Sequence, residues 1–148
     1  MTTRRKFIQQ LAVGAAATGF STSAFPNILI PNKKDRLGIA LMGLGYYSTD
    51  LLAPALQLTK HCYLAGIVTG TPAKAERWKK QYNIPDKNIY NYENFDSIAD
   101  NPDIDVVYVV LPPALHAEYA IRAANAGKHV FCEKPMAMTT GECEAMIK

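Results

Sequence analysis

The stretch LGIALMGLGYYS, residues 37–48, decides the fold. Its first six residues are mostly apolar, which predicts a strand buried on both faces, and they run directly into Gly43, Gly45 and Ser48. The glycines match the first two of a G-x-G-x-x-G turn, and Ser48 replaces the third. The first two allow a sharp turn and let backbone amides approach a pyrophosphate, whereas the third only permits close helix packing. The stretch predicts a dinucleotide-binding turn, with an ordinary strand-to-helix turn as the alternative.

The alternation of strand and helix continues along the chain. Apolar runs predict three more strands buried on both faces, at 62–69, 106–111 and 129–132, and a shorter strand near Ile89 and Tyr90. The helical stretches between them are 47–59, 72–82 and 115–126, with a helical turn at 95–99 and a last helix that begins near Thr139. This alternation implies a parallel sheet with right-handed crossovers. The predicted fold class is α/β, a Rossmann-type doubly wound sheet over residues 37–148.

The end of the second predicted strand bears on the choice of dinucleotide. A site for NAD usually carries Asp or Glu about 20 residues beyond the glycines, where it holds the ribose 2′-hydroxyl. This chain has Thr69 there, which would not repel a 2′-phosphate. Thr71 is a candidate N-cap with Pro72 at the first helical position, so Lys74 falls in the first helical turn. These residues favour NADP, with NAD as the other possibility and a solvated surface position as the alternative for Lys74.

Two other strand ends carry unusual residues. The strand at 106–111 leaves through Pro112 and Pro113, and His116 follows at the start of a helix. The strand at 129–132 ends in Glu133, Lys134 and Pro135. Ligands of open parallel sheets bind beyond the carboxyl ends of the strands, so both loops are candidates for the site. For His116, packing or capping is the alternative to cofactor contact, and for Lys134 it is an ion pair with Glu133.

These motifs together identify a resemblance. The segments GLGYYS (43–48) and VLPPALHAEYAIRAANAGKHVFCEKPMA (110–137), preceded by the basic and apolar amino terminus, resemble the Gfo/Idh/MocA oxidoreductase family, especially exported glucose-fructose oxidoreductases. The resemblance implies a Rossmann domain followed by a second α/β domain with a large open sheet. The chain stops inside the helix after the Glu-Lys-Pro loop. We therefore expect it to be the amino-terminal part of an enzyme, homo-oligomeric at full length, that binds cofactor here without turning over substrate.

The resemblance also implies roles for single residues. Lys134 would hydrogen-bond a substrate hydroxyl near the nicotinamide, and Glu133 and Pro135 would fix that lysine. Beside the positive charge of an oxidised nicotinamide an ammonium loses its proton more readily, which suits proton removal from a sugar hydroxyl as hydride leaves the same carbon. Pro135 restricts Lys134 to extended geometry, and the bond between them is a candidate for the cis form.

Lys134 is thus the predicted catalytic residue. By the same resemblance Thr69, Lys74 and Tyr92 lie near the adenosine 2′-phosphate. The complete predicted cofactor-binding set is Gly43, Leu44, Gly45, Tyr46, Thr69, Lys74, Tyr92, Leu111, Pro112, His116, Glu133 and Lys134.

The amino terminus predicts export. Arg4, Arg5 and Lys6 are the only charges in residues 1–24, and an apolar stretch from Phe7 to Phe20 and small residues follow them, as in a twin-arginine signal. We expect a signal at 1–24 and an extended connector at 25–36, which place the protein in the periplasm or outside the cell. A membrane-anchoring helix is the alternative, but the stretch is too short and glycine-rich to span a bilayer well. Twin-arginine export carries folded proteins, which suits a protein that captures its cofactor first.

Composition and charge exclude other classes. From residue 25 onward 13 basic and 13 acidic side chains balance, so no basic surface for nucleic acid is expected. The three cysteines, Cys62, Cys132 and Cys143, form no Cys-x-x-Cys pair, and no metal site is predicted; Cys62 and Cys132 are expected to be small buried residues.

Three functions remain open. The first is an NADP-dependent oxidoreductase acting on a sugar or polyol, either with exchangeable cofactor or with a tightly held cofactor that is recycled between two substrates. The second is a glycoside hydrolase of the same family that uses bound NAD for transient oxidation. The third is a non-catalytic cofactor-binding module.

Overall fold

A computed structural model describes residues 34–148. The predicted export signal, and the predicted connector up to residue 33, lie outside the described residues.

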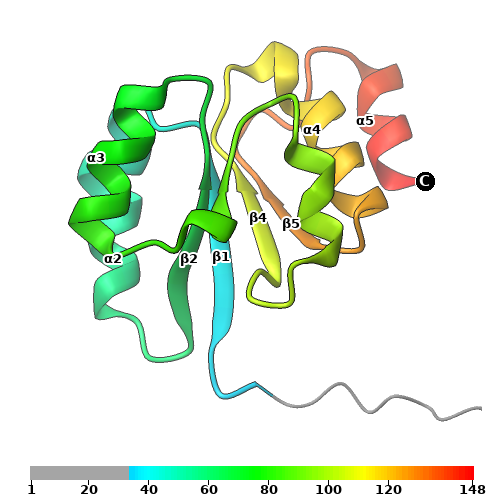
Figure 1. The fold of residues 1–148 in the computed structure, drawn as a ribbon. Helices are drawn as coiled ribbons and strands as arrows, with labels where there is room; N and C mark the ends of the chain where they lie inside the picture. Colours follow the sequence, from blue (N-terminus) through cyan, green and yellow to red (C-terminus); the bar gives the residue numbers. More distant parts are fainter. Residues whose placement is uncertain (1–33) are drawn as a thin grey trace, which may run out of the picture. The chain divides into compact units, whose positions relative to one another are not determined.

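The centre of the structure is a five-stranded sheet in which all paired strands are parallel (Figure 1). Its strands are β1 (Leu37–Met42), β2 (Cys62–Val68), β3 (Ile89–Tyr90), β4 (Val106–Val109) and β5 (His129–Cys132). They are arranged in the order β3-β2-β1-β4-β5, so β1 is central and the chain turns to the other side of it between β3 and β4. This reversal is the switch point of a doubly wound sheet, which confirms the predicted Rossmann-type fold.

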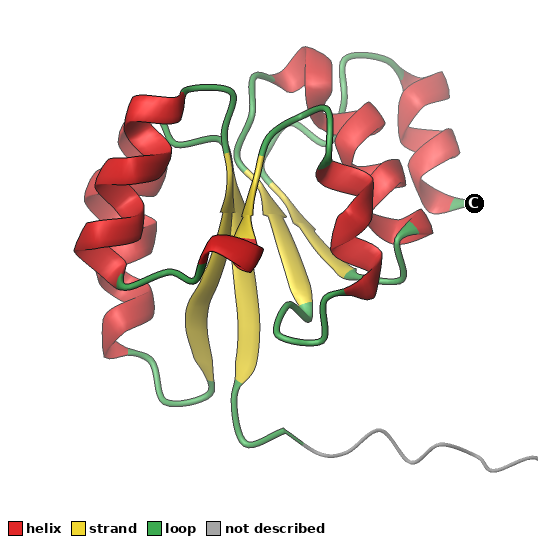
Figure 2. Cartoon of the chain, viewed as in Figure 1, coloured by secondary structure: helices red, strands yellow, loops and turns green. Residues whose placement is uncertain are grey.

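Helices cover both faces of the sheet (Figure 2). The helical segments are η2 (Tyr47–Leu52, a π-helical turn), α2 (Ala53–Leu58), α3 (Pro72–Tyr82), η3 (Asp86–Asn88), η4 (Phe95–Asp100), η5 (Pro113–Leu115), α4 (His116–Asn125) and α5 (Thr140–Ile147). On one face α2 and α3 bury Ala53 and Trp78 against β1 and β2. On the other face η4 and α4 bury Phe95 and Tyr119 against the opposite side of the same strands. Within residues 34–148, no helix combines the length and the apolar character needed to cross a bilayer.

The local patterns explain most element boundaries. Strand β1 buries five of its six residues because it has neighbours on both sides and helices on both faces. Helix α3 has the predicted bounds, and it ends at Asn83 in the left-handed conformation, a common way to end a helix. Helix α5 begins after Thr139, whose side chain forms a reciprocal capping box with Glu142.

Some expectations were wrong. Strand β5 is not buried on both faces: His129 and Phe131, which share one face, are exposed, whereas Val130 and Cys132 on the opposite face pack against the core on the side that α4 covers. Strand β4 ends at Val109, two residues earlier than predicted. Cys62 and Cys132 are half-buried rather than buried, since Cys62 lies at the entrance of β2 and Cys132 on the edge strand.

Candidate functional site

The glycine turn begins the candidate site. Because the strands are parallel, their carboxyl ends all meet at one edge of the sheet, and the turn leaves β1 at that edge. Gly43 has a φ of 93°, and a Cβ at this position would lie 2.4 Å from the Val110 carbonyl oxygen. Its amide donates to the Val68 carbonyl at 3.1 Å, which ties the turn to the end of β2. Only glycine fits this position, because both the left-handed backbone and the contact exclude a side chain.

The second glycine has the opposite surroundings. A Cβ on Gly45 would meet no atom within 4 Å, so the protein does not require glycine there for its own packing. The open space lies next to backbone amides at the start of a helical segment, where a pyrophosphate can approach closely. The residues present therefore fit a dinucleotide. Leu44 is buried in the core and offers only its backbone, whereas the Tyr46 side chain is exposed at the turn.

Ser48 does more than replace a glycine. It is fully buried, and its hydroxyl donates to the Gly43 carbonyl at 2.5 Å. The helix that follows starts as a π-helical turn, in which the Ala53 amide donates to the Ser48 carbonyl, before it continues as α2. The serine thus stabilises the turn that the glycines form.

The end of β2 carries the residues predicted for the adenosine side. Thr69 is buried, and its hydroxyl accepts from the Thr71 amide at 3.2 Å. Thr71 occupies the N-cap position of α3 as predicted, but its side chain makes no capping bond. Lys74 lies in the first turn of α3, and its ammonium donates to the Leu44 carbonyl at 3.1 Å. Lys74 therefore reaches back to the glycine turn instead of extending freely into solvent.

A hollow of about 240 Å³ adjoins this strand end. Residues from the ends of β2 and β3 and from the start of α3 line it, among them Thr69, Gly70 and Asn91. Tyr92 lies beside it, since a side chain on Gly70 would meet the Tyr92 ring at 3.2 Å. Burial, and then the neighbouring Tyr119, raise the pKa of Tyr92 above its ordinary value. The three residues that were predicted near the 2′-phosphate thus gather around the end of β2.

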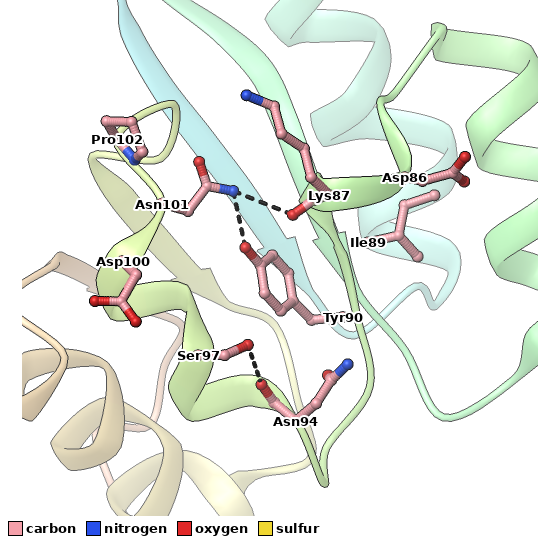
Figure 3. A pocket seen from close by; sticks show the side chains of 9 residues that line it. All are labelled: Asp86, Lys87, Ile89, Tyr90, Asn94, Ser97, Asp100, Asn101 and Pro102. Atoms are coloured by element: carbon pink, nitrogen blue, oxygen red, sulfur yellow. Dashed lines mark hydrogen bonds between the residues drawn. The ribbon is translucent and has the colours of Figure 1, made fainter.

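A larger hollow of about 410 Å³ lies elsewhere, around η3, β3 and η4 (Figure 3). The Asn101 side chain donates to the Tyr90 hydroxyl at 2.8 Å and to the Lys87 carbonyl at 3.2 Å, and the Ser97 hydroxyl donates to the Asn94 carbonyl at 2.7 Å. None of the predicted site residues lines this hollow. Its size alone is no reason to place chemistry in it.

The loops after β4 and β5 are joined through His116. This histidine is buried, with Nδ1 at 2.7 Å from the Pro135 carbonyl oxygen and Nε2 at 2.8 Å from the Leu111 carbonyl oxygen. Both ring nitrogens are thus engaged within the protein, which favours packing over direct cofactor contact. Pro112, in the same loop, is exposed, and its carbonyl accepts from the Leu115 amide.

The three residues of the Glu-Lys-Pro segment differ in their contacts with the rest of the protein. The Glu133 carboxylate accepts from the Tyr108 hydroxyl at 2.6 Å and from the Lys134 amide at 3.3 Å. The bond between Lys134 and Pro135 is cis. Lys134 is exposed, and among residues 34–148 no hydrogen bond or ion pair reaches its ammonium. The alternative of a Glu-Lys ion pair at the strand end is therefore not what the structure contains.

The structure brings the predicted residues to one edge of the sheet, in two groups. The glycine turn and Lys74 are joined through the Leu44 carbonyl, and the loops after β4 and β5 are joined through His116. Their cofactor-binding roles stay predictions. In the part of the chain that the structure covers, no three or more His, Cys, Asp or Glu side chains gather as a metal site would require.

Sequence reasoning missed Tyr108. It lies 25 residues before Glu133, and no local motif connects the two. Its side chain meets the Glu-Lys-Pro loop only because β4 and β5 pair in the register that sets Tyr108 opposite Phe131. A strand-pairing prediction with that register is the only signal that could have found it.

The geometry defines a nucleotide-binding domain of the Rossmann class. Comparison with known proteins then gives the family: residues 37–148 match the Gfo/Idh/MocA group, described as an oxidoreductase family with an NAD-binding Rossmann fold. The chain belongs to this family, as its motifs predicted.

Individual relatives are sugar and polyol enzymes. The chain is 34% identical over 139 residues to levoglucosan dehydrogenase from Pseudarthrobacter phenanthrenivorans, covering 94% of this chain and 30% of that protein. It is 27% identical over 112 residues to inositol 2-dehydrogenase from Salmonella typhimurium, covering 76% and 32%.

Among solved structures, an aldose-aldose oxidoreductase from Caulobacter crescentus, complexed with glycerol, is 53% identical, with a TM-score of 0.74 and coverage of 76% of this chain and 33% of that chain. A 3-ketoreductase from Actinomadura kijaniata in complex with NADP is 27% identical, with a TM-score of 0.66 and coverage of 76% and 34%. The chain spans about a third of the length of these relatives.

Proposed function

We propose that this chain is the nucleotide-binding part of an NADP-dependent oxidoreductase that transfers hydride between the nicotinamide and a hydroxyl or carbonyl carbon of a sugar or polyol. One observation carries the proposal: the open space at Gly45 lies at the same edge of the sheet as the Lys134 ammonium, which has no hydrogen-bond or ion-pair partner among residues 34–148. The first suits a pyrophosphate and the second suits proton transfer, and an open parallel sheet binds its ligands at this edge.

The division of work follows from what each group offers. The bound nicotinamide supplies the hydride acceptor or donor. Backbone amides of the glycine turn bind the pyrophosphate, because Gly43 permits the turn and Gly45 leaves the approach open. Lys134 takes the proton of the substrate hydroxyl, or returns it in reduction, and its side chain, which is exposed and bonded to no group in the described part of the chain, is available for that role.

Two features support NADP over NAD. The end of β2 carries Thr69 where a carboxylate would repel a 2′-phosphate, and the Lys74 ammonium lies close by at the glycine turn. A relative that matches the chain over the same region is a 3-ketoreductase in complex with NADP. Thr69 and Lys74 already have partners within the protein, but the Lys74 ammonium has three N–H donors and can keep the Leu44 carbonyl while it also donates to a phosphate.

The substrate class rests on the relatives. Levoglucosan, inositol and aldoses, named for the enzymes this chain is similar to, all carry ring or chain hydroxyl groups. At 53% identity the aldose-aldose oxidoreductase favours an aldose as substrate.

We further propose that residues 1–24 export the protein through the twin-arginine route. Changing Arg4 and Arg5 to Lys should leave the precursor in the cytoplasm, as cell fractionation would show.

The test is made on the complete protein as its gene encodes it. The purified enzyme should contain or bind NADP, seen as nicotinamide absorbance and by calorimetry, and should change that absorbance when an aldose is added. NAD should bind at least about tenfold more weakly, which corresponds to about 1.4 kcal/mol. Absence of both cofactor binding and aldose-dependent absorbance change would refute the proposal. Release of sugar from a glycoside without net change in cofactor would support the glycoside hydrolase instead.

A further inference from the structure

The loop that carries Lys134 is held from both faces of the sheet. On the face covered by α2 and α3, the Tyr108 hydroxyl donates to the Glu133 carboxylate at 2.6 Å. The side chains of Tyr108, Phe131 and Glu133 share this face because β4 and β5 pair Tyr108 with Phe131, and Glu133 is two residues further along. The Tyr108 and Phe131 rings meet edge to face with centroids 5.7 Å apart, which sets the orientation of the phenol.

On the other face, which α4 covers, His116 fixes the residue after Lys134. Its Nδ1 lies 2.7 Å from the Pro135 carbonyl oxygen, and its Nε2 lies 2.8 Å from the Leu111 carbonyl oxygen. A carbonyl oxygen only accepts, and a neutral imidazole carries one N–H, so the ring donates to one of these two carbonyls and packs against the other; the tautomer decides which. His116 is 1% exposed, so water does not compete for either contact. The ring therefore ties the loop after β5 to the loop after β4.

Lys134 lies between these two anchors and has none of its own. The residue before it is held through its carboxylate and the residue after it through its carbonyl, whereas no hydrogen bond or ion pair joins the Lys134 ammonium to residues 34–148. Fixing the backbone on both sides of a long, flexible side chain limits where its end can go. Catalytic groups that are misplaced by about 1 Å lose roughly a hundredfold in rate.

We infer that Tyr108 and His116 are positioning residues, which hold the Lys134 backbone from opposite faces of the sheet so that its ammonium reaches the reacting hydroxyl. The inference rests on the proposed function, because it gives the lysine a reaction to serve. Neither residue touches the substrate in this account, since both side chains are turned toward the protein and bonded there.

The state of the phenol is consistent with this role. Burial, and then the bond to Glu133, raise the pKa of Tyr108 far above its ordinary value. The hydroxyl therefore stays protonated across the physiological range and remains a donor to the carboxylate. Tyr108→Phe removes this one donor and keeps the ring contact with Phe131, so the variant should fold.

The experiment compares Tyr108→Phe, His116→Phe and His116→Gln with wild type in the complete, cofactor-loaded enzyme. We expect Tyr108→Phe to lower kcat about tenfold and His116→Phe about thirtyfold, with KM and NADP affinity changed less than about threefold. Because the Gln amide restores a donor, His116→Gln should recover at least a third of the decrease in log kcat that His116→Phe causes. Matched controls are Tyr82→Phe and His61→Phe, since Tyr82 lies on α3 away from the loop and His61 is exposed.

Amide hydrogen exchange supplies a readout that is independent of turnover. In Tyr108→Phe and His116→Phe, the amides of Lys134, Met136 and Ala137 should exchange at least about tenfold faster, while those of β1 stay at the wild-type rate. If the wild type is active and the variants keep its kcat, or keep its exchange rate in the loop, the positioning inference is wrong and the proposed function still stands. A general rise in exchange that includes β1 also overturns the positioning inference, because it marks a merely structural role. A wild type without aldose-dependent hydride transfer overturns the proposed function, and with it the catalytic purpose of the anchors.

Discussion

The two edges of the sheet differ in how their charged groups are satisfied. At the amino edge, where the strands begin, Asp105 accepts from the Lys34 ammonium at 2.6 Å and from the Gly38 amide at 2.8 Å. The Lys128 ammonium donates to the Asn101 carbonyl there at 2.8 Å. At the carboxyl edge, the Lys134 ammonium has no partner among residues 34–148. Paired charges stabilise the fold, whereas an unpaired one at a strand end is available to a ligand.

Glycines show the same difference. A Cβ on Gly38, at the amino edge, would lie 1.9 Å from the Asp103 carbonyl oxygen, whereas a Cβ on Gly45 would meet nothing within 4 Å. The position of Gly38 is closed by the protein's own atoms and that of Gly45 leaves room, although Gly43 beside it is closed by the Val110 carbonyl. We expect a side chain at Gly38 to cost stability and a side chain at Gly45 to cost function.

Lys134→Ala should have the largest effect. Turnover by the complete enzyme should fall about a thousandfold, or about 4 kcal/mol in activation free energy, because the proton acceptor is lost. The free energy of unfolding should change by less than about 0.5 kcal/mol, since the side chain is exposed and has no polar partner within residues 34–148. Steady-state kinetics and urea unfolding measure the two quantities, with the exposed Lys80→Ala as control. Near-normal turnover would remove the role assigned to Lys134.

Gly38→Ala should destabilise the domain by about 3 kcal/mol, because the new methyl group overlaps a backbone carbonyl that cannot move independently. Gly45→Ala is the matched change at the open edge. It should leave stability within about 0.5 kcal/mol of wild type and weaken NADP binding about tenfold. Chemical denaturation and calorimetry on both variants test the pair, and equal stabilities would contradict the distinction between the edges.

Asp105→Ala should cost about 2 kcal/mol of stability. The change leaves the Gly38 amide without its acceptor and the Lys34 ammonium without its carboxylate. Cofactor affinity should be unchanged, because Asp105 precedes β4 at the edge away from the site. Thermal unfolding with and without NADP measures the stability and the cofactor affinity. A loss of NADP affinity without a loss of stability would contradict the prediction.

Thr69→Asp should weaken NADP relative to NAD about tenfold, or about 1.4 kcal/mol, by placing a carboxylate next to the 2′-phosphate. Thr69→Ser is the control, because it keeps the hydroxyl that accepts from the Thr71 amide. Titration of both dinucleotides gives the ratio of affinities. An unchanged ratio would show that the phosphate binds elsewhere.

The smallest expected effect is the loss of the Asp103 contribution to stability at low pH. The hydrogen bond from Lys87 holds the pKa of Asp103 below its ordinary value, so its folded-state pKa lies under the unfolded one. Its contribution to stability is therefore complete above about pH 4, the unfolded value, and is lost as the pH falls through the lower folded-state pKa. Because both side chains are partly exposed, Asp103→Asn should cost less than about 1 kcal/mol at pH 7 and less still in high salt. Denaturation at pH 7 and pH 3 should show the difference between variant and wild type shrink at the lower pH.

Much of the fold could be predicted because its signals are local. The bounds of β1 and α3 agree with the apolar run before Gly43 and with the Thr-Pro start of the helix. Strand β5 was predicted to be buried because its composition is that of an inner strand. Its exposure depends on what lies beside it, and an apolar run carries no information about its neighbours.

The candidate site also has a part that local sequence predicts and a part that only the tertiary structure shows. Residue type and position after a strand led to the prediction of Gly43, Gly45 and Lys134 as site residues; the structure places all three at the carboxyl edge of the sheet, and their roles stay predictions. The partners of these residues came only from the assembled sheet. Tyr108 reaches Glu133 across two strands, and His116 reaches the carbonyl of a residue 19 positions away. Such contacts depend on strand register and helix placement, which are set by packing of the whole domain and not by any one segment.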